Sequence, residues 1–263
     1  MKNKPQSFPL QKFYQPYLFF PYEKKVRDFA LYYLKGSQIL DAGCGNGWLS
    51  ICAENEGYNV YSVDLANNEI KESRFIFKRK KSRAALTKAS LCGLPFTNSA
   101  FDTIICINVL EHVLDIEKAF LNLKTVLRKG GRLIVMIPNG LTFGLFYDRF
   151  AYRLIPANAI VSRVHKTLFS MTADELSVLK LNEEEPIGHC QEFTISRIRS
   201  LLREHGFKII KIVNCRFLSP YMRSLCTLLG KKPMLEFEKF DSKLAEKVPS
   251  NLASEWMIVC EKQ

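Results

Sequence analysis

The sequence predicts a doubly wound α/β fold, in which a mostly parallel sheet carries helices on both faces. From about residue 37 to residue 138, short apolar runs alternate with helical stretches, a pattern typical of parallel strands joined by right-handed crossovers. A glycine-rich stretch follows the first apolar run, at the edge where such sheets bind ligands. The length of 263 residues fits one large domain, or one domain with a sizeable insertion.

Each element is justified by its own local signals. Strands are expected at 38–41, 59–64, 101–107, 132–137, 207–213 and 256–260, where apolar residues run together. Helices are expected at 48–55, 67–80, 116–127 and 195–204, with residues 220–249 mostly helical. Asp115 and Thr194 can cap the two later helices. The glycines after 116–127, at 130 and 131, predict that this helix ends in a left-handed cap.

The chain divides into four expected parts. Residues 1–36 form an N-terminal helical lid segment, and residues 37–138 form the α/β core. Residues 139–189 break the alternation, are rich in aromatics, and are too long for a simple connection. We expect a helical insertion there that covers an acceptor, although the same aromatics could simply form the core of that insertion. Residues 190–263 complete the core.

Composition excludes several classes of protein. The chain is 47% hydrophobic and 24% charged, as in soluble globular proteins. No apolar run approaches the roughly 18 residues that span a bilayer, and prolines interrupt the apolar N-terminus, so we expect a cytoplasmic protein. The eight cysteines form no Cys-x-x-Cys pair, which disfavours a zinc site or a disulfide framework.

The net charge of +12 is concentrated in part at residues 71–83, which hold seven basic residues and one acid. Such an excess attracts phosphates, nucleic acid or anionic membranes. The favoured interpretation is the solvated face of a surface helix. No nucleic-acid partner is expected, because the sequence carries no zinc finger or RNA-binding signature.

The glycine loop at residues 41–47 reads DAGCGNG and lies between a strand and a helix. Glycines there let the backbone turn sharply and approach a ligand. The N-terminus of the following helix presents free N–H groups and a positive dipole end, which suit a carboxylate or a phosphate. The spacing G-x-G-x-G differs from the G-x-G-x-x-G of dinucleotide sites, which disfavours a nicotinamide oxidoreductase.

Asp64 ends the second strand and follows the loop at a suitable separation. A carboxylate at this position can accept hydrogen bonds from both ribose hydroxyls of an adenosine. The alternative is that Asp64 only caps the next helix. We favour the ribose interpretation because the loop and the acid occur together.

These motifs, with four further ones, resemble the class I S-adenosylmethionine-dependent methyltransferases, in their small-molecule branch. The further motifs are Leu-Pro-Phe at 94–96, Phe-Asp-Thr-Ile at 101–104, Val-Leu-Glu-His-Val at 109–113 and Leu-Arg-Lys-Gly-Gly at 127–131. The resemblance covers about residues 39–213 and the final strand. It implies a sheet of seven strands whose last strand is antiparallel, and S-adenosylmethionine as the cofactor.

The resemblance also implies residue roles. Three glycines would cradle the methionine end of the cofactor, Asp64 would bind the ribose, and Asn108 would border the amino-acid part. Family members often place an acid before Leu-Pro-Phe to contact the adenine amine, but this chain has Ser90 there, which puts that contact in doubt. The cofactor-binding set implied in this way is Asp41, Gly43, Gly45, Gly47, Asp64, Leu65, Ser90, Leu91 and Asn108.

Methyl transfer requires an acceptor held in line with the S–CH3 bond, and an oxygen acceptor can also need a general base. The candidate bases are His112, His165 and His189. Some quinone-type O-methyltransferases bind a divalent metal at a Glu-x-x-Glu-His cluster, of which Glu111 and His112 remain here without the first acid. We favour catalytic histidines at His112 and His189, expected close together, over a metal.

We therefore expect a methyltransferase of a small-molecule acceptor, acting at oxygen. One alternative is a peripheral membrane enzyme with a lipid-linked acceptor, such as a quinone or a polyprenyl-linked glycan, whose aromatic walls and basic surface would rest on a membrane. Another is a non-catalytic, cofactor-binding partner protein, which the missing acid at Ser90 favours.

Overall fold

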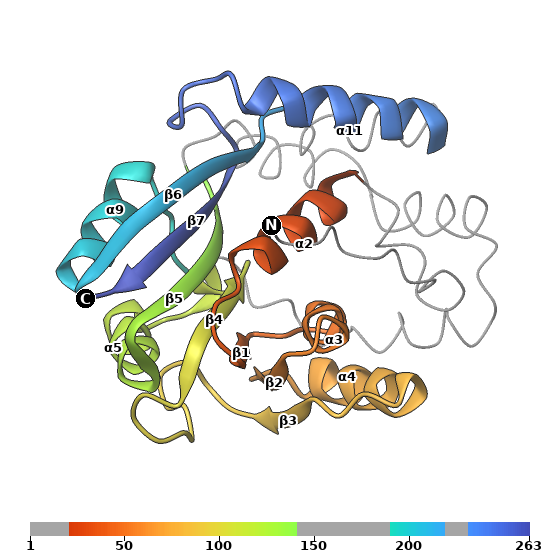
Figure 1. Cartoon of the computed structure of the whole chain (residues 1–263). Helices are drawn as coiled ribbons and strands as arrows, with labels where there is room; N and C mark the ends of the chain where they lie inside the picture. Colours follow the sequence, from red (N-terminus) through yellow and green to blue (C-terminus); the bar gives the residue numbers. More distant parts are fainter. Residues whose placement is uncertain (1–20, 141–189, 219–230) are drawn as a thin grey trace.

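The structure is a computed structural model that describes residues 21–140, 190–218 and 231–263 (Figure 1). Its strands are β1 (Gln38–Ala42), β2 (Asn59–Asp64), β3 (Ala85–Lys88), β4 (Phe101–Ile107), β5 (Leu127–Pro138), β6 (Phe207–Arg216) and β7 (Glu255–Lys262). Its helices are α2 (Pro21–Tyr33), α3 (Trp48–Asn55), α4 (Asn67–Lys80), the 3-10 turn η1 (Leu110–His112), α5 (Ile116–Val126), α9 (Ile195–Glu204) and α11 (Lys231–Ala245).

One sheet of seven strands, in the order β3-β2-β1-β4-β5-β7-β6, organises the described residues. Strand β7 runs antiparallel to both β5 and β6, and the remaining neighbouring strands pair in parallel. The expected doubly wound sheet with an antiparallel last strand is therefore confirmed. The order reverses between β1 and β4, which places the topological switch point beside the glycine loop.

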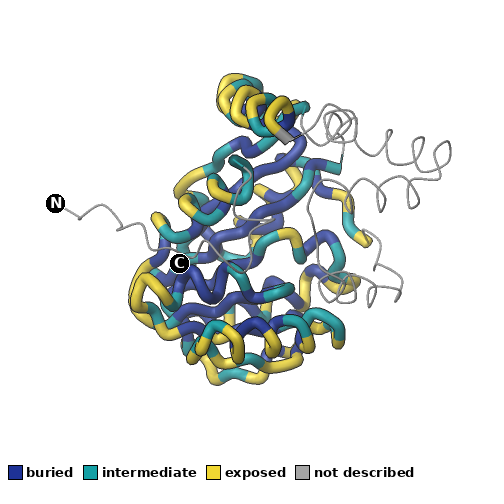
Figure 2. Tube along the Cα trace, turned by 90° about the vertical axis from the view of Figure 1, so that its right-hand side faces the viewer, coloured by how far each residue is buried: buried dark blue, intermediate teal, exposed yellow. Residues whose placement is uncertain are grey.

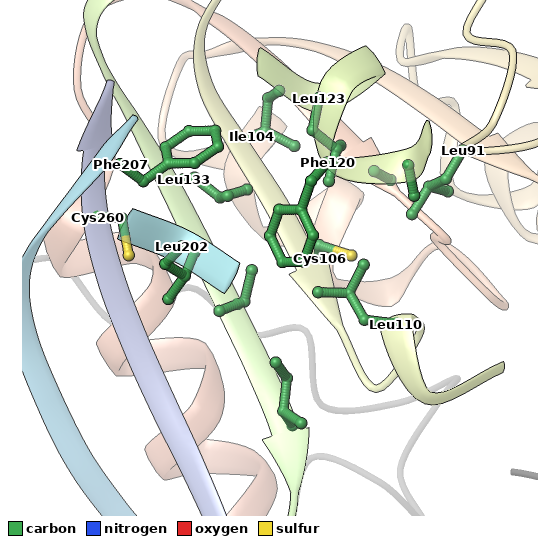
Figure 3. Packing of buried hydrophobic residues seen from close by; sticks show 14 of the residues in the cluster. Leu91, Ile104, Cys106, Leu110, Phe120, Leu123, Leu133, Leu202, Phe207 and Cys260 are labelled. Atoms are coloured by element: carbon green, nitrogen blue, oxygen red, sulfur yellow. The ribbon is translucent and has the colours of Figure 1, made fainter. Parts of the chain in front are cut away.

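Helices cover both faces of the sheet. On one face, Phe120 of α5 and Leu202 of α9 are buried in a cluster with strand residues such as Ile104 and Leu133 (Figure 3). On the other face, Ala30 of α2 packs with residues of α3 and the central strands. Figure 2 shows the strands as the buried interior and the outer faces of the helices as exposed. This apolar interior holds the strand ends in fixed positions around the site.

Helix α2 lies within the segment expected to be a lid. Its residues Val26 and Ala30 are buried against the sheet, so residues 21–33 pack as part of the core layer. Residues 1–20 and 141–189, which include the expected aromatic lid and insertion, lie outside the described residues. The lid role and the four expected boundaries stay predictions.

The end of helix α5 differs from the expectation. The helix ends at Val126, and the segment 127–131 belongs to β5, where Leu127 pairs with Phe101. The last carbonyls of the helix are not satisfied by a glycine cap. Instead the Lys262 ammonium donates to the carbonyls of Lys124 and Leu127, at 2.6 Å each. A cation at the negative end of the helix dipole therefore stabilises these carbonyls in place of the expected glycine cap.

Candidate cofactor site

The three loop glycines all have positive φ, but they meet different surroundings. A Cβ on Gly43 would lie 2.3 Å from Val109, and one on Gly47 would lie 2.3 Å from Phe77. Among the described residues, a Cβ on Gly45 would meet only the Glu69 carboxylate, at 3.5 Å. Gly43 and Gly47 are therefore required by packing. Of the three glycines, Gly45 alone has space beside it that no other described residue fills, and a bound cofactor would fit there.

The loop is held by the neighbouring strand. The backbone N–H groups of Gly43 and Cys44 donate to the Val63 carbonyl, at 2.8 and 2.9 Å. The Ser73 hydroxyl of α4 donates to the Gly45 carbonyl. Because β1 and β2 end side by side, these contacts bring the loop against the end of β2.

Asp64 is at that end, and its carboxylate meets the loop. One oxygen accepts from the Gly45 N–H at 2.9 Å, and the other accepts from the Ala66 N–H at 2.9 Å. The N-cap residue of α4 is Ala66, so Asp64 does not stand at the cap position itself. A carboxylate has about four acceptor sites, so two protein bonds leave capacity for ligand hydroxyls.

Asp41 lies beneath the loop and is only 3% exposed. The Ser50 hydroxyl donates to it at 2.5 Å, and the Ser62 hydroxyl donates to Ser50 at 2.9 Å. Burial raises the pKa of Asp41 to about 6, against the opposing effect of the Ser50 hydrogen bond. The geometry makes Asp41 a buried support of the loop, and a direct contact with the cofactor stays a prediction.

Glu69 is a site residue that sequence reasoning missed. It lies in the first turn of α4, and its carboxylate approaches Gly45. Burial, together with the nearby carboxylates of Glu72 and Asp64, raises the pKa of Glu69 to about 7. Only its position in the first turn of the helix that follows Asp64 could have indicated it.

The residues expected near the adenine lie on two loops. Leu65 is 53% exposed beside Asp64, whereas Leu91 is buried in the core. The Ser90 hydroxyl accepts from the Cys92 N–H at 3.2 Å, so it is engaged in its own turn. Ser90 keeps the capacity for a further bond, and an adenine contact stays a prediction.

A third group of expected site residues follows strand β4. Asn108 is exposed, has φ +52°, and donates its backbone N–H to the Met136 carbonyl at 3.0 Å. Glu111, in η1, is 2% exposed, and its Oε2 has no hydrogen bond among the described residues. Burial raises the pKa of Glu111 to about 7. A carboxyl with such a pKa can exchange a proton near neutral pH.

His112 is half-buried at the end of η1. The backbone N–H groups of Cys190 and Gln191 donate to the Glu111 carbonyl at 2.8 and 3.0 Å, which ties the return of the chain to η1. His165 and His189 lie outside the described residues. The expected proximity of His112 and His189 therefore stays a prediction. No group of three metal-ligating side chains occurs in residues 21–140, 190–218 and 231–263.

A family profile described as a methyltransferase domain matches residues 14–212, more than half of the chain. Among curated proteins, the O-methyltransferase resE of Aspergillus sclerotiorum is 25% identical over 214 residues, covering 80% of this chain and 69% of that protein. The ubiquinone biosynthesis O-methyltransferase of Rickettsia prowazekii is 26% identical over 125 residues, covering 46% and 49%. The chain spans about half the length of this relative and of its counterparts in other Rickettsia species.

Solved structures share the fold at low identity. Geranyl diphosphate C-methyltransferase from Streptomyces coelicolor A3(2) superposes with a TM-score of 0.59 at 15% identity, covering 92% of this chain and 79% of that one. The [4+2]-cyclase SpnF superposes with a TM-score of 0.58 at 14% identity, covering 91% and 80%. The profile match, the sheet order and the glycine loop agree, and the chain therefore belongs to the class I S-adenosylmethionine-dependent methyltransferase family.

Proposed function

We propose that this protein transfers a methyl group from S-adenosylmethionine to an oxygen atom of a small-molecule acceptor. The observation that carries the proposal is the contact between the open Gly45 cradle and Asp64, at the switch point of the sheet. The O-methyltransferase names of the relatives from Aspergillus and Rickettsia favour oxygen as the acceptor atom.

Different residues of the protein would bind the cofactor and accept the proton. When bound, the cofactor supplies a methyl group activated by a sulfonium. Gly45 would leave room for its methionine end, Asp64 would accept from the ribose hydroxyls, and Asn108 would border the amino-acid part. The cofactor would supply the methyl group by displacement at its sulfonium, with the demethylated thioether as the leaving group and the acceptor oxygen as the nucleophile. His112 or His189 takes the proton that the oxygen loses.

Titration calorimetry with Asp64→Ala tests the cofactor site. Wild type is expected to bind S-adenosylmethionine and S-adenosylhomocysteine, and to show no heat with NAD. Loss of a charged acceptor for hydroxyls costs about 1.5 to 3 kcal/mol, which weakens affinity about tenfold or more.

Asp28→Ala is the control for that variant, because Asp28 is an exposed acid of α2 whose ion pairs are with Lys24 and Arg27 of the same helix. It should leave the dissociation constant unchanged. NAD binding without any response to the sulfur cofactors would overturn the proposal. An unchanged dissociation constant in folded Asp64→Ala would reassign Asp64 to supporting the loop and helix α4.

A lipid-linked acceptor is the second candidate, and one observation favours it. Phe75 is 56% exposed on α4, beside the exposed cations Lys71, Arg74 and Lys78. An aromatic side chain among cations suits an anionic membrane surface. No helix among the described residues is long and apolar enough to cross a membrane. Sedimentation with vesicles containing phosphatidylglycerol would detect such binding, and Phe75→Ala should weaken it.

A further inference from the structure

Two carboxyl groups approach Gly45, and they differ in how the protein holds them. Asp64 accepts from the Gly45 N–H and from the Ala66 N–H, at 2.9 Å each, so both of its oxygens are fixed. Glu69 Oε2 lies 3.5 Å from the position that a Cβ on Gly45 would take. Within the described part of the chain, the Glu69 carboxyl makes no hydrogen bond and no ion pair. Its acceptor capacity is therefore available to a ligand beside Gly45.

The spacing along helix α4 explains why Glu69 reaches the loop. Residues four positions apart lie on the same face of a helix, so Glu69 and Ser73 share one face of α4. The Ser73 hydroxyl donates to the Gly45 carbonyl, and a Cβ on Gly47 would lie 3.3 Å from the same hydroxyl oxygen. That face of α4 therefore packs against the glycine loop, where Glu69 is half-buried.

The negative charge of Glu69 is not offset by a nearby cation in the described residues. Burial, Glu72 of the same helix and Asp64 at the end of β2 all act to raise its pKa. Helix α4 carries many cations, but those closest in sequence, Lys71 and Arg74, are exposed and form no ion pair with Glu69. An ionised Glu69 beside Asp64 therefore makes the cradle negative, and a cationic ligand would relieve that excess charge.

The cofactor and its product differ in charge. S-adenosylmethionine carries a sulfonium, an ammonium and a carboxylate, so it is a net cation. S-adenosylhomocysteine has a neutral thioether in place of the sulfonium and carries no net charge. The sulfonium joins the methionine part to the ribose, so it would lie between the groups assigned to Gly45 and Asp64, close to Glu69. Opposite charges attract more strongly in a partly buried site than in water.

We propose that Glu69, together with Asp64, selects the cationic cofactor over its neutral product. The proposal rests on the proposed function, because S-adenosylmethionine is assigned there to the Gly45 cradle. Attraction between the Glu69 carboxylate and the sulfonium stabilises the complex before transfer and is lost once the methyl group has left. Glu69 thereby favours the exchange of product for fresh cofactor.

The test compares the dissociation constants of S-adenosylmethionine and S-adenosylhomocysteine by calorimetry at pH 8, where a carboxyl with a pKa of about 7 is mostly ionised. Both ligands carry the same ammonium and carboxylate, so the difference between them isolates the sulfonium. Glu69→Gln keeps the size of the side chain and removes its charge. It should raise the dissociation constant of S-adenosylmethionine about tenfold and that of S-adenosylhomocysteine less than about twofold.

Glu56→Gln is the matched control, because it removes the same charge from an exposed acid at the end of α3. It should leave the ratio of the two dissociation constants as in wild type.

An unchanged ratio in folded Glu69→Gln would overturn the proposal, and Glu69 would then be an acid that only interacts with the dipole at the start of α4. If Glu69→Gln does not fold, Glu69→Ala replaces it, because alanine is the best helix former and also removes the charge. Glu69→Ala should shift the ratio in the same direction, and an unchanged ratio in it would count against the proposal. Wild type that binds neither ligand would overturn the proposed function itself, a separate outcome.

Discussion

At the scale of single residues, a substitution at Gly45 should weaken ligand binding while the protein still folds. Gly45→Ala introduces a methyl group at φ +52° that, among the described residues, meets only the Glu69 carboxylate at 3.5 Å, so its folding cost is the left-handed strain of about 1 to 2 kcal/mol. The same methyl group enters the space proposed for the cofactor. We therefore expect a folded variant whose affinity for S-adenosylmethionine falls at least about tenfold, measured by calorimetry beside urea denaturation.

Gly57→Ala is the matched control for that strain. Gly57 has φ +90°, and no heavy atom of the part of the chain that the structure describes lies within 4 Å of its would-be Cβ. It follows the end of α3, the helix whose start adjoins the loop. It should lose a similar amount of stability and keep wild-type affinity. Gly47→Ala, by contrast, should fail to fold well, because its methyl group would lie 2.3 Å from Phe77. Full affinity in folded Gly45→Ala would show that the cradle does not face the cofactor.

The sequence predicted the glycine loop and Asp64 because both depend on local signals, a strand end followed by a tight turn. It could not assign separate roles to the glycines. Their neighbours Val109 and Phe77 come from other elements, and contact with them depends on the packed fold. Glu69 was missed for the same reason. A single acid in the first turn of a helix has no distinctive signature, and it approaches Gly45 only once α4 has packed against the loop.

At the scale of elements, periodicity predicted strands and helices well where apolar residues repeat. It failed at the end of α5, because the pairing of Leu127 with Phe101 extends β5 backward and a distant lysine satisfies the helix carbonyls. Strand β3 was also missed. Its four residues lie at the edge of the sheet, and none of them is fully buried, so they carry no apolar pattern.

The prediction at the scale of elements concerns helix α2, the first described element whose side chains are buried in the core. A variant that begins at Pro21 keeps the hydrogen bond from Tyr22 to Glu255 of β7 and keeps Val26 in the core. It should therefore bind S-adenosylmethionine with near wild-type affinity. If residues 1–20 close over the acceptor, transfer of labelled methyl groups into a metabolite and lipid extract should fall about tenfold or more. Such a loss is the usual size when reactants are poorly positioned.

A variant that begins at Phe29 is the comparison. It removes both Tyr22 and Val26 from the sheet, so it should lose stability and cofactor binding together. Equal losses of binding and transfer in the variant that begins at Pro21 would instead make residues 1–20 part of the core fold, and would remove the lid interpretation.

At the scale of the whole molecule, buried acids should make stability depend on pH in an unusual direction. Burial raises the pKa of Asp41 from 3.8 to about 6 and that of Glu111 from 4.5 to about 7. Between pH 4 and pH 7 the folded protein therefore binds more protons at these groups than the unfolded chain does. Their contribution to the free energy of unfolding falls as pH rises through that window.

Asp41→Asn tests this contribution. The rise in the pKa of Asp41 to about 6 corresponds to about 3 kcal/mol, lost by the wild type when the buried carboxyl ionises. The neutral amide still accepts from Ser50 and carries no charge to bury. We expect Asp41→Asn to match wild type near pH 4 and to be more stable by about 1 to 3 kcal/mol at pH 8, as measured by urea denaturation.

Asp102 provides a control of opposite sign. Hydrogen bonds from the Gln38 and Ser37 N–H groups and from Arg128 lower its pKa, so its ionised form stabilises the fold and its contribution is lost as pH falls. Asp102→Asn should therefore be less stable than wild type at pH 8 and approach it in acid. If Asp41→Asn loses stability at pH 8 as Asp102→Asn does, then the hydroxyl and the backbone N–H of Ser50 stabilise a charged Asp41 more than burial penalises it. The carboxylate beneath the glycine loop would then be ionised at neutral pH, adding negative charge below the proposed cofactor site.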